Sequence, residues 1–335
     1  MAHIGILGSG SWGTAIAFHL ANQGYEVRLW ARDPALAEEI QQTRQNSRYL
    51  PGFELPVDVL CSGDMGQVLA GATTAYFVVP SHGLRDVASV AAPLLDPQAH
   101  VVAACKGIEN STLQLMNEVL SATLRPEQAQ RLCALGGPSF AREVAAGMPT
   151  AVCVASADSP SATRIQAQLN GERLRVYTTD DLIGLELGGA LKNVIAIAVG
   201  ASDGLGFGYN ARAALITRGI AEITRLAVQL GANPQTLAGL GGLGDLVLTC
   251  TGDLSRNRRV GLLLGQGMSL EEVMGQSTMV AEGVRTARSA HALGQRVGVE
   301  MPITREVYLA LYEGKAPTDA VSSLLQRALR PERDQ

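Results

Sequence analysis

Lysine is scarce in this chain. The 335 residues include 27 lysines and arginines, but only Lys106, Lys192 and Lys315 are lysines. Arginine serves wherever a fixed positive charge is sufficient, so a retained lysine indicates a position where an amine that can lose its proton matters. Lys315 lies in the polar turn EGKAP and is expected to be only a surface charge.

The chain also lacks any excess of positive charge. Its formal net charge is −4 and its sequence pI is about 5.8. Nucleic acids and anionic membranes attract strongly basic surfaces, so neither partner is indicated, and any anion site must be local. With 47% hydrophobic and 4% aromatic residues, the composition is that of a globular protein long enough for two domains.

Patterns typical of metal sites, disulfides and membrane spans are missing as well. The five cysteines include no CxxC pair, and the five histidines are scattered without HExxH spacing. Free thiols in a reducing compartment are therefore expected, and no metal is predicted. A strand-like run begins at once without a signal peptide, and no uncharged apolar run reaches the ~18 residues of a membrane span. A cytoplasmic location is expected.

Eight short apolar runs predict strands in the first 180 residues. They are apolar throughout rather than alternating, which is typical of strands covered on both faces, and helical patterns follow the first, second, fourth and fifth. This alternation predicts a mainly parallel, doubly wound, Rossmann-like α/β sheet. The predicted strands are His3–Leu7, Glu26–Trp30, Val57–Leu60, Ala75–Val79, Val101–Cys105, Leu132–Leu135, Ala151–Ala155 and Leu174–Tyr177.

From about Asp181 onward the pattern changes. Long Ala/Leu/Val stretches with helical spacing replace the strand-like runs. We predict a first domain over residues 1–180 and an all-helical second domain over 181–330. The segment from Asp181 to Gly200 is expected to form one long helix that joins them.

The first predicted strand leads into a glycine-rich turn. Gly8, Gly10 and Gly13 form GxGxxG between a strand and a helix, which is the context of a dinucleotide-binding site. Arg32 and Asp33 follow the second strand. An acidic residue there favours NAD, and an arginine favours the 2′-phosphate of NADP. Because Asp-Pro is also typical of a helix start, Arg32 is the expected cofactor contact; NADPH is favoured, with NADH tolerated.

Two further groups follow predicted strands. Lys106 comes after VVAAC, and Gly136, Gly137 and Ser139 come after LCAL. In a parallel sheet these strand ends face the ligand crevice. A surface loop lysine and a simple strand–helix turn remain the alternatives.

The second half offers a phosphate-binding pattern. Ser255, Arg256 and Asn257 supply a guanidinium and neutral donors, although a solvated basic stretch is the alternative. Asp245 lies between small residues and an apolar run, and Glu282 occupies a polar notch. Neither acidic residue indicates a role by itself.

Lys192 lies inside the apolar run GGALKNVIAIAVG. Burying an unpaired ammonium is costly, so burial should depress its pKa toward the working range of a proton donor or acceptor. The sequence leaves open which neighbour compensates its charge.

Taken together, these blocks resemble the bacterial-type NAD(P)-dependent glycerol-3-phosphate dehydrogenases over nearly the full length. The resemblance implies a Rossmann domain, a helical substrate domain of the 6-phosphogluconate dehydrogenase C-terminal type, and an active site between them. It also implies reduction of dihydroxyacetone phosphate to sn-glycerol 3-phosphate for phospholipid synthesis, with NADPH or NADH, and a possible homodimer. The blocks that carry it are GSGSWGTA, ACKGIE, GGPSFAREV, GALKNVIAIAVGASDGLGFGYNARAALITRG, GLGGLGDLVLTCTGDLSRNRRVG and AEGVRTA.

The resemblance also implies residue roles. Lys192 matches the proton acceptor, and Lys106 matches a residue that touches both cofactor and substrate. The other implied cofactor contacts are Ser11, Trp12, Arg32, Ala141, Arg256, Val280 and Glu282. The other implied substrate contacts are Gly137, Ser139, Asp245, Ser255, Arg256 and Asn257.

Two alternatives remain at this level. A related two-domain reductase, such as a 3-hydroxyacid dehydrogenase or a ketopantoate reductase, would bind a carboxylate substrate; the SRNRR stretch and the block from Gly189 to Asn210 argue against it. A regulatory protein that senses a dinucleotide without catalysis would not need Lys192 in an apolar helix.

Overall fold

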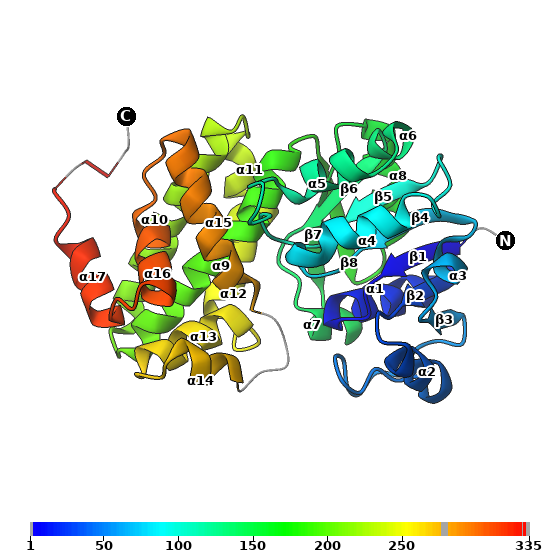
Figure 1. The fold of residues 1–335 in the computed structure, drawn as a ribbon, viewed down its shortest axis with the longest axis horizontal. Helices are drawn as coiled ribbons and strands as arrows, with labels where there is room; N and C mark the ends of the chain where they lie inside the picture. The colour runs from blue at the N-terminus through cyan, green and yellow to red at the C-terminus, as the bar shows by residue number, and fades with distance from the viewer. Residues whose placement is uncertain (1–2, 276–280, 330, 333–335) are drawn as a thin grey trace.

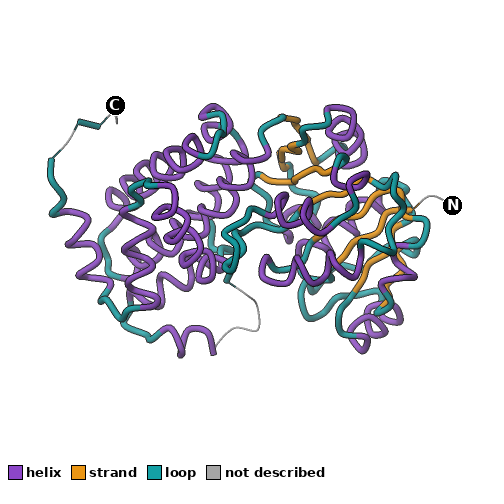
Figure 2. The backbone as a smooth tube through the Cα atoms, turned by 45° about the horizontal axis from the view of Figure 1, so that its top comes forward, coloured by secondary structure: helices purple, strands orange, loops and turns teal. Residues whose placement is uncertain are grey.

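The computed structural model describes residues 3–275, 281–329 and 331–332. All strands that it describes lie before residue 180, and the described chain beyond that point consists of helices and the loops that connect them. The two parts lie side by side, with the sheet at the end that holds the N-terminus and the helical part at the other (Figure 1). Figure 2 shows the same separation, with every strand in one half of the molecule.

All eight predicted strands form, in one sheet of order β3-β2-β1-β4-β5-β6-β7-β8. Every neighbouring pair is parallel except β6 and β7, which are antiparallel. The predicted mainly parallel, doubly wound sheet is thus confirmed. The strands are β1 (His3–Leu7), β2 (Val27–Trp30), β3 (Val59–Ser62), β4 (Ala72–Phe77), β5 (His100–Ala103), β6 (Leu132–Gly136), β7 (Thr150–Ala155) and β8 (Leu174–Thr179).

Helices cover the sheet and connect its strands. The expected helices after β1, β2, β4 and β5 are present, but the helix between β7 and β8 is not predicted by the sequence, because serine, threonine and glutamine dilute its apolar pattern. Asp158 caps this helix by accepting a hydrogen bond from Ser161 N at 3.1 Å. The helical elements are α1 (Ser11–Asn22), α2 (Pro34–Thr43), α3 (Met65–Leu69), η1 (Ser81–Gly83), α4 (Leu84–Ala91), α5 (Met116–Thr123), α6 (Pro126–Ala129), α7 (Ala141–Ala145) and α8 (Ser159–Leu169).

The second part is built around the predicted long helix, α9 (Leu182–Gly204). An 18-residue stretch of α9 is apolar enough to cross a membrane, with mean hydropathy 1.7, but 83% of that stretch is buried inside the molecule. α9 is therefore a core helix. The elements that follow it are α10 (Gly208–Gln229), α11 (Pro234–Ala238), the π-helical turn η2 (Leu240–Gly244), α12 (Asp245–Thr251), α13 (Arg256–Gly265), α14 (Leu270–Gly275), α15 (Glu282–Val297), α16 (Pro302–Tyr312) and α17 (Pro317–Leu325).

Glycines let α9 and α13 approach until their backbones touch. A Cβ atom added to Gly200 would lie 2.0 Å from Arg258 O, and one added to Gly261 would lie 2.0 Å from Ile197 O. Atoms cannot approach so closely, so this packing requires glycine at both positions. The contact fixes α13 against the core helix.

Lys315 departs from its expected role. Its Nζ donates to Glu306 Oε2 at 2.5 Å and to Ser323 Oγ at 2.8 Å, and 25% of its side chain is exposed. The prediction of a mere surface charge is wrong. Lys315 instead links α16 to α17.

Candidate active site

The buried lysine of α9 has a carboxylate partner. Lys192 Nζ donates to Asp245 Oδ1, and the exposed fractions of the two side chains are 9% and 1%. Asp245 begins α12, directly after the π-helical turn η2. Asp245 is therefore the neighbour that compensates the charge of Lys192.

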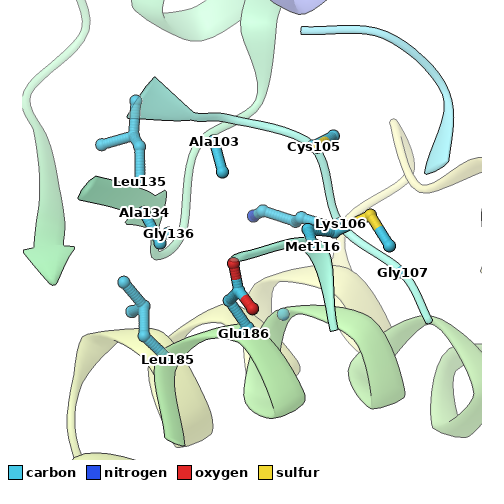
Figure 3. Close-up of a pocket in the computed structure, with 11 residues that line it drawn as sticks. Ala103, Cys105, Lys106, Gly107, Met116, Ala134, Leu135, Gly136, Leu185 and Glu186 are labelled. Atoms are coloured by element: carbon cyan, nitrogen blue, oxygen red, sulfur yellow. The ribbon is translucent and has the colours of Figure 1, made fainter. Parts of the chain in front are cut away.

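Lys106 binds the other oxygen of the same carboxylate. It extends over α9 from the loop that follows β5 (Figure 3). Its Nζ donates to Asp245 Oδ2 at 2.6 Å and to Gly137 O at 3.3 Å. Its methylene groups lie over Gly189, where an added Cβ would be 3.4 Å from Lys106 Cδ. The structure thus gathers two lysines around one carboxylate.

Burial tunes the amine of Lys192. Loss of solvent lowers its pKa to about 7; Asp245 opposes this change and the positive charge of Lys106 reinforces it. The amine of Lys192 can therefore both donate and accept a proton near neutral pH.

The glycine-rich turn is shaped to hold a phosphate group. Gly8 has a φ of +122°, and a Cβ there would lie 2.5 Å from Val78 O. A Cβ at Gly13 would lie 1.9 Å from Gly8 O, whereas a Cβ at Gly10 would meet nothing within 4 Å. The space over Gly10 opens at the N-terminus of α1, where free backbone N–H groups favour an anion. The cradle fits the pyrophosphate of a dinucleotide.

A segment that the sequence analysis missed supports this turn. The buried Asn46 donates from Nδ2 to Ser9 O at 2.8 Å, and Ser11 Oγ donates to Tyr49 O at 2.6 Å. Trp12 and Ala141 both pack against one small apolar cluster between α1 and α7. The only hint in the sequence is an asparagine shortly before YLP, which carries no mechanism by itself.

The end of β2 separates the two candidate cofactor residues. Asp33 caps α2 by accepting from Ala35 N at 3.1 Å, and its other oxygen lies 3.9 Å from Arg48 Nη1. Arg32 is exposed beside it. The interpretation of Asp33 as a helix cap is confirmed, and its negative charge is partly offset by Arg48.

Gly137 and Ser139 lie beside Lys106. The carbonyl of Gly137 accepts from both Lys106 Nζ and Ser139 Oγ, the latter at 3.1 Å. Gly137 has a φ of +115°, so glycine is favoured there. The loop after β6 therefore contributes to the same site as the loop after β5.

The predicted donor residues at the start of α13 differ in their exposure to solvent. Arg256, the first helical residue, is exposed, whereas Ser255 and Asn257 are buried. Ser255 caps the helix by accepting from Arg258 N at 3.2 Å. Asn257 Nδ2 donates to Asn193 Oδ1 at 2.9 Å, so its amide is engaged with α9. Arg256 is thus the exposed member of this set.

Glu282 connects the two parts of the molecule. Ser81 Oγ, at the start of η1, donates to Glu282 Oε2 at 2.7 Å. The next residue, Gly283, donates its N–H to Asn257 Oδ1 at 2.9 Å. Val280, the remaining implied cofactor contact, lies outside the described residues.

Comparison with known proteins places this site in a family. The profile of the NAD-dependent glycerol-3-phosphate dehydrogenase N-terminus matches residues 3–162, and that of the C-terminus matches residues 181–322. The chain belongs to this family. A glycerol-3-phosphate dehydrogenase [NAD(P)+] from Geobacter metallireducens is 53% identical over 330 residues, covering 98% of each chain.

Solved structures of glycerol-3-phosphate dehydrogenases share the fold. The enzyme from Coxiella burnetii aligns with a TM-score of 0.93 and 44% identity, covering 97% of this chain and 99% of its own. A ketopantoate reductase from Ralstonia eutropha aligns with a TM-score of 0.60 and 18% identity, covering 95% and 99%. The second likeness concerns the fold alone, so the carboxylate reductases are not favoured.

Proposed function

We propose that this protein is an NAD(P)-dependent glycerol-3-phosphate dehydrogenase that reduces dihydroxyacetone phosphate to sn-glycerol 3-phosphate. The observation that carries the proposal is the Asp245 carboxylate shared by Lys106 and Lys192. Two neighbouring ammonium groups can stabilise the negative charge that develops on a ketone oxygen during reduction. Membership of the family supplies the substrate class.

Lys192 gives the proton that the reduction requires. Bound NADPH or NADH supplies the hydride for C2 of the ketone. Lys106 polarises the carbonyl oxygen, and Lys192 protonates it because its pKa of about 7 leaves a large protonated fraction at neutral pH. Asp245 holds both ammonium groups in place. In the reverse direction, neutral Lys192 accepts the proton of the alcohol.

The residues that would hold the dinucleotide lie at the carboxyl ends of the strands. Gly8, Gly10 and Gly13 receive the pyrophosphate at the N-terminus of α1. Arg32 binds the 2′-phosphate, which favours NADPH over NADH. The remaining cofactor contacts that we propose are Ser11, Trp12, Lys106, Ala141, Arg256, Val280 and Glu282.

The phosphate of the substrate binds at the N-terminus of α13. The exposed Arg256 offers a bidentate guanidinium, and the first backbone N–H groups of this ten-residue helix favour an anion. Ser255 and Asn257 shape that terminus, and Gly137 and Ser139 border the substrate near Lys106. This anchoring fixes C2 against the cofactor.

One assay tests the function against its alternatives. NADPH absorbance is followed with dihydroxyacetone phosphate, with ketopantoate and without substrate. We expect oxidation of NADPH only with dihydroxyacetone phosphate, with sn-glycerol 3-phosphate as the product. Turnover with ketopantoate would favour a carboxylate reductase, and binding of NADPH without turnover of either ketone would favour a regulatory protein.

We also propose a division into domains at residue 180, a homodimer and a cytoplasmic location. The gap between the two family profiles, from residue 162 to 181, supports the division. Exposed aromatic side chains of Phe207 and Tyr209 at the start of α10 support an assembly that covers them. Five free cysteines support a reducing compartment. Light scattering on the purified protein tests the dimer.

A further inference from the structure

Basic side chains from both parts of the molecule meet near His82. Arg32 follows β2 and His82 lies in η1 after β4, both in the sheet part, whereas Arg285 lies in α15 of the helical part. All three basic side chains are exposed. The proposed cofactor site includes Arg32 but gives no task to His82 or Arg285.

The order of the strands brings Arg32 and His82 to the two sides of the glycine-rich turn. Leu7, at the end of β1, pairs with Trp30 of β2 and with Phe77 of β4. Arg32 and His82 follow those two residues, so they flank the turn that is shaped for the pyrophosphate. A dinucleotide in such a turn places its adenosine ribose beside the end of the second strand.

Hydrogen bonding and packing hold the start of α15 at the same place. Ser81, next to His82, donates from Oγ to Glu282 Oε2 at 2.7 Å. A Cβ added to Gly107 would lie 2.5 Å from Ser81 Cβ and 3.8 Å from Glu282 Oε2, so the loop after β5 packs against this contact. Glu282 and Arg285 are three residues apart in one helix and therefore lie on the same face of it.

The electrostatics of His82 agree with this arrangement. Partial loss of solvent lowers the pKa of His82; the positive charge of Arg285 lowers it further, Glu282 opposes the change, and Arg32 adds a smaller decrease. Among the described residues, no hydrogen bond or ion pair holds the guanidinium group of Arg32 or that of Arg285. Both groups are thus available to an anionic ligand.

We propose that Arg285 and Arg32 together bind the 2′-phosphate of NADPH, so that this phosphate links the helical part to the sheet part beside η1. The inference rests on the proposed use of NADPH. A phosphomonoester carries a charge of about −1.5 to −2 at pH 7, which one arginine neutralises only in part, and Glu282 adds negative charge nearby. The uncharged 2′-hydroxyl group of NADH gains nothing from Arg285.

Arg285→Ala tests the inference by binding, without turnover. We expect the dissociation constant of NADPH to rise about tenfold or more, because a charge-assisted contact to phosphate is lost, and that of NADH to change by less than about twofold. Adenosine 2′,5′-bisphosphate should weaken by the same factor as NADPH. AMP, which lacks only the 2′-phosphate, should bind as it does to the wild-type protein. Calorimetric titration measures all four constants.

Arg288→Ala is the matched control. Arg288 is also exposed and lies in α15, but its guanidinium carbon is 4.3 Å from the ring centre of Tyr312 in α16. Both substitutions remove one positive charge from the same helix. A general electrostatic effect of α15 on the cofactor would therefore weaken NADPH equally in both variants. We expect Arg288→Ala to change none of the four constants by more than about twofold.

Hydrogen exchange tests the link between the two parts. Amides at the start of α15 should exchange more slowly when adenosine 2′,5′-bisphosphate saturates the wild-type protein than when AMP does, because the 2′-phosphate holds Arg285 to the sheet part. Arg285→Ala should abolish this difference, whereas Arg285→Lys, which keeps the charge, should retain part of it.

Three results would overturn the inference. They are NADPH affinity that falls no more in Arg285→Ala than in Arg288→Ala, equal weakening of NADPH and NADH in Arg285→Ala, and exchange at the start of α15 that is the same with both adenosine nucleotides. A wild-type protein that shows the expected binding pattern but does not oxidise NADPH with dihydroxyacetone phosphate would instead overturn the proposed function and leave this phosphate site in place.

Discussion

Asp245 compensates two lysines with a single carboxylate, and its side chain is only 1% exposed. Removal of that carboxylate would leave two neighbouring ammonium groups without a compensating negative charge. Substitutions of the lysines themselves are therefore more informative, because they change one cation and leave the carboxylate paired with the other.

Lys192→Arg separates charge from proton transfer. Arginine keeps the positive charge but cannot deprotonate. We expect turnover to fall by about 100-fold or more, with the dissociation constant of NADPH near its wild-type value. Stopped-flow absorbance and fluorescence titration measure these two quantities. Lys315→Arg, remote from the site, is the control; wild-type turnover in Lys192→Arg would refute the proton-donor role.

The two directions of the reaction should respond oppositely to pH. In the proposed mechanism, reduction needs protonated Lys192. Burial lowers the pKa of Lys192 to about 7, so kcat for reduction should fall as pH rises through that value. Oxidation of glycerol 3-phosphate needs the neutral amine and should rise over the same range. Initial rates from about pH 5.5 to about pH 9.5 test this pattern. Parallel profiles in both directions would exclude Lys192 as the shared group.

Arg32→Ala should change the choice between cofactors. Loss of one charge-assisted contact to the 2′-phosphate costs about 1.5–3 kcal/mol, so we expect NADPH to bind about tenfold or more weakly. NADH binding should change little. Fluorescence titration with both cofactors decides this, and the exposed Arg173 provides a remote Arg→Ala control. Equal weakening for both cofactors would place Arg32 elsewhere in the cofactor site.

At the scale of elements, the contact of α9 with α13 holds the proposed phosphate site against the core. Gly261→Ala places a methyl group where Ile197 O already lies, and backbone atoms cannot move aside as a flexible side chain can. We expect a loss of about 1–3 kcal/mol or more in the free energy of unfolding. Gly275→Ala, which meets nothing within 4 Å, should be neutral. Urea denaturation of both variants measures the difference.

The elements that the sequence predicts well are those whose burial is local. The inner strands and the long helix α9 are predictable because continuous apolar runs mark elements covered on every side. The edge strands β3 and β8 are also predicted, although exposed residues such as Leu60 and Tyr177 show that they are covered on one face only. The antiparallel direction of β7 is not predictable from the sequence, because an apolar run does not indicate the direction of its strand. Helix α8 escapes prediction because much of its surface is polar and its apolar residues are few.

The sequence predicts which types of residue form the site, but not which of them contact one another. A lysine in an apolar helix indicates a tuned amine from the sequence alone. Its partner Asp245 lies 53 residues further along the chain, and Lys106 lies 139 residues before that aspartate. Asn46 escapes prediction, because a single asparagine in a sequence carries no sign of what it will support.

At the scale of the whole molecule, the site is assembled from both parts. Lys106 and Gly137 come from loops of the sheet, whereas Lys192 and Asp245 come from the helical part. Ligands that touch both parts should therefore stabilise the whole chain cooperatively. Neither part alone contains all the residues of the proposed active site.

Ligand binding should accordingly raise the melting temperature. NADPH at about 100 times its dissociation constant contributes about 2.7 kcal/mol, and glycerol 3-phosphate should add to this. We expect Lys106→Ala to reduce the additional shift from glycerol 3-phosphate, since this side chain connects the two parts. Differential scanning fluorimetry measures the shifts, with glycerol as the ligand that lacks the phosphate. An equal shift with glycerol would contradict phosphate recognition.

The length of the π-helical turn η2 fixes the direction in which the Asp245 side chain points. Each residue in an α-helix advances the direction of the following side chains by about 100°. The wide turn over Leu240–Gly244 therefore sets the angular phase of α12 as it begins at Asp245. Deleting a single glycine from LGGLG would rotate that carboxylate away from both lysines while every other residue of the site was kept. The length of this short segment is thus as much a part of the site as the identity of its charged groups.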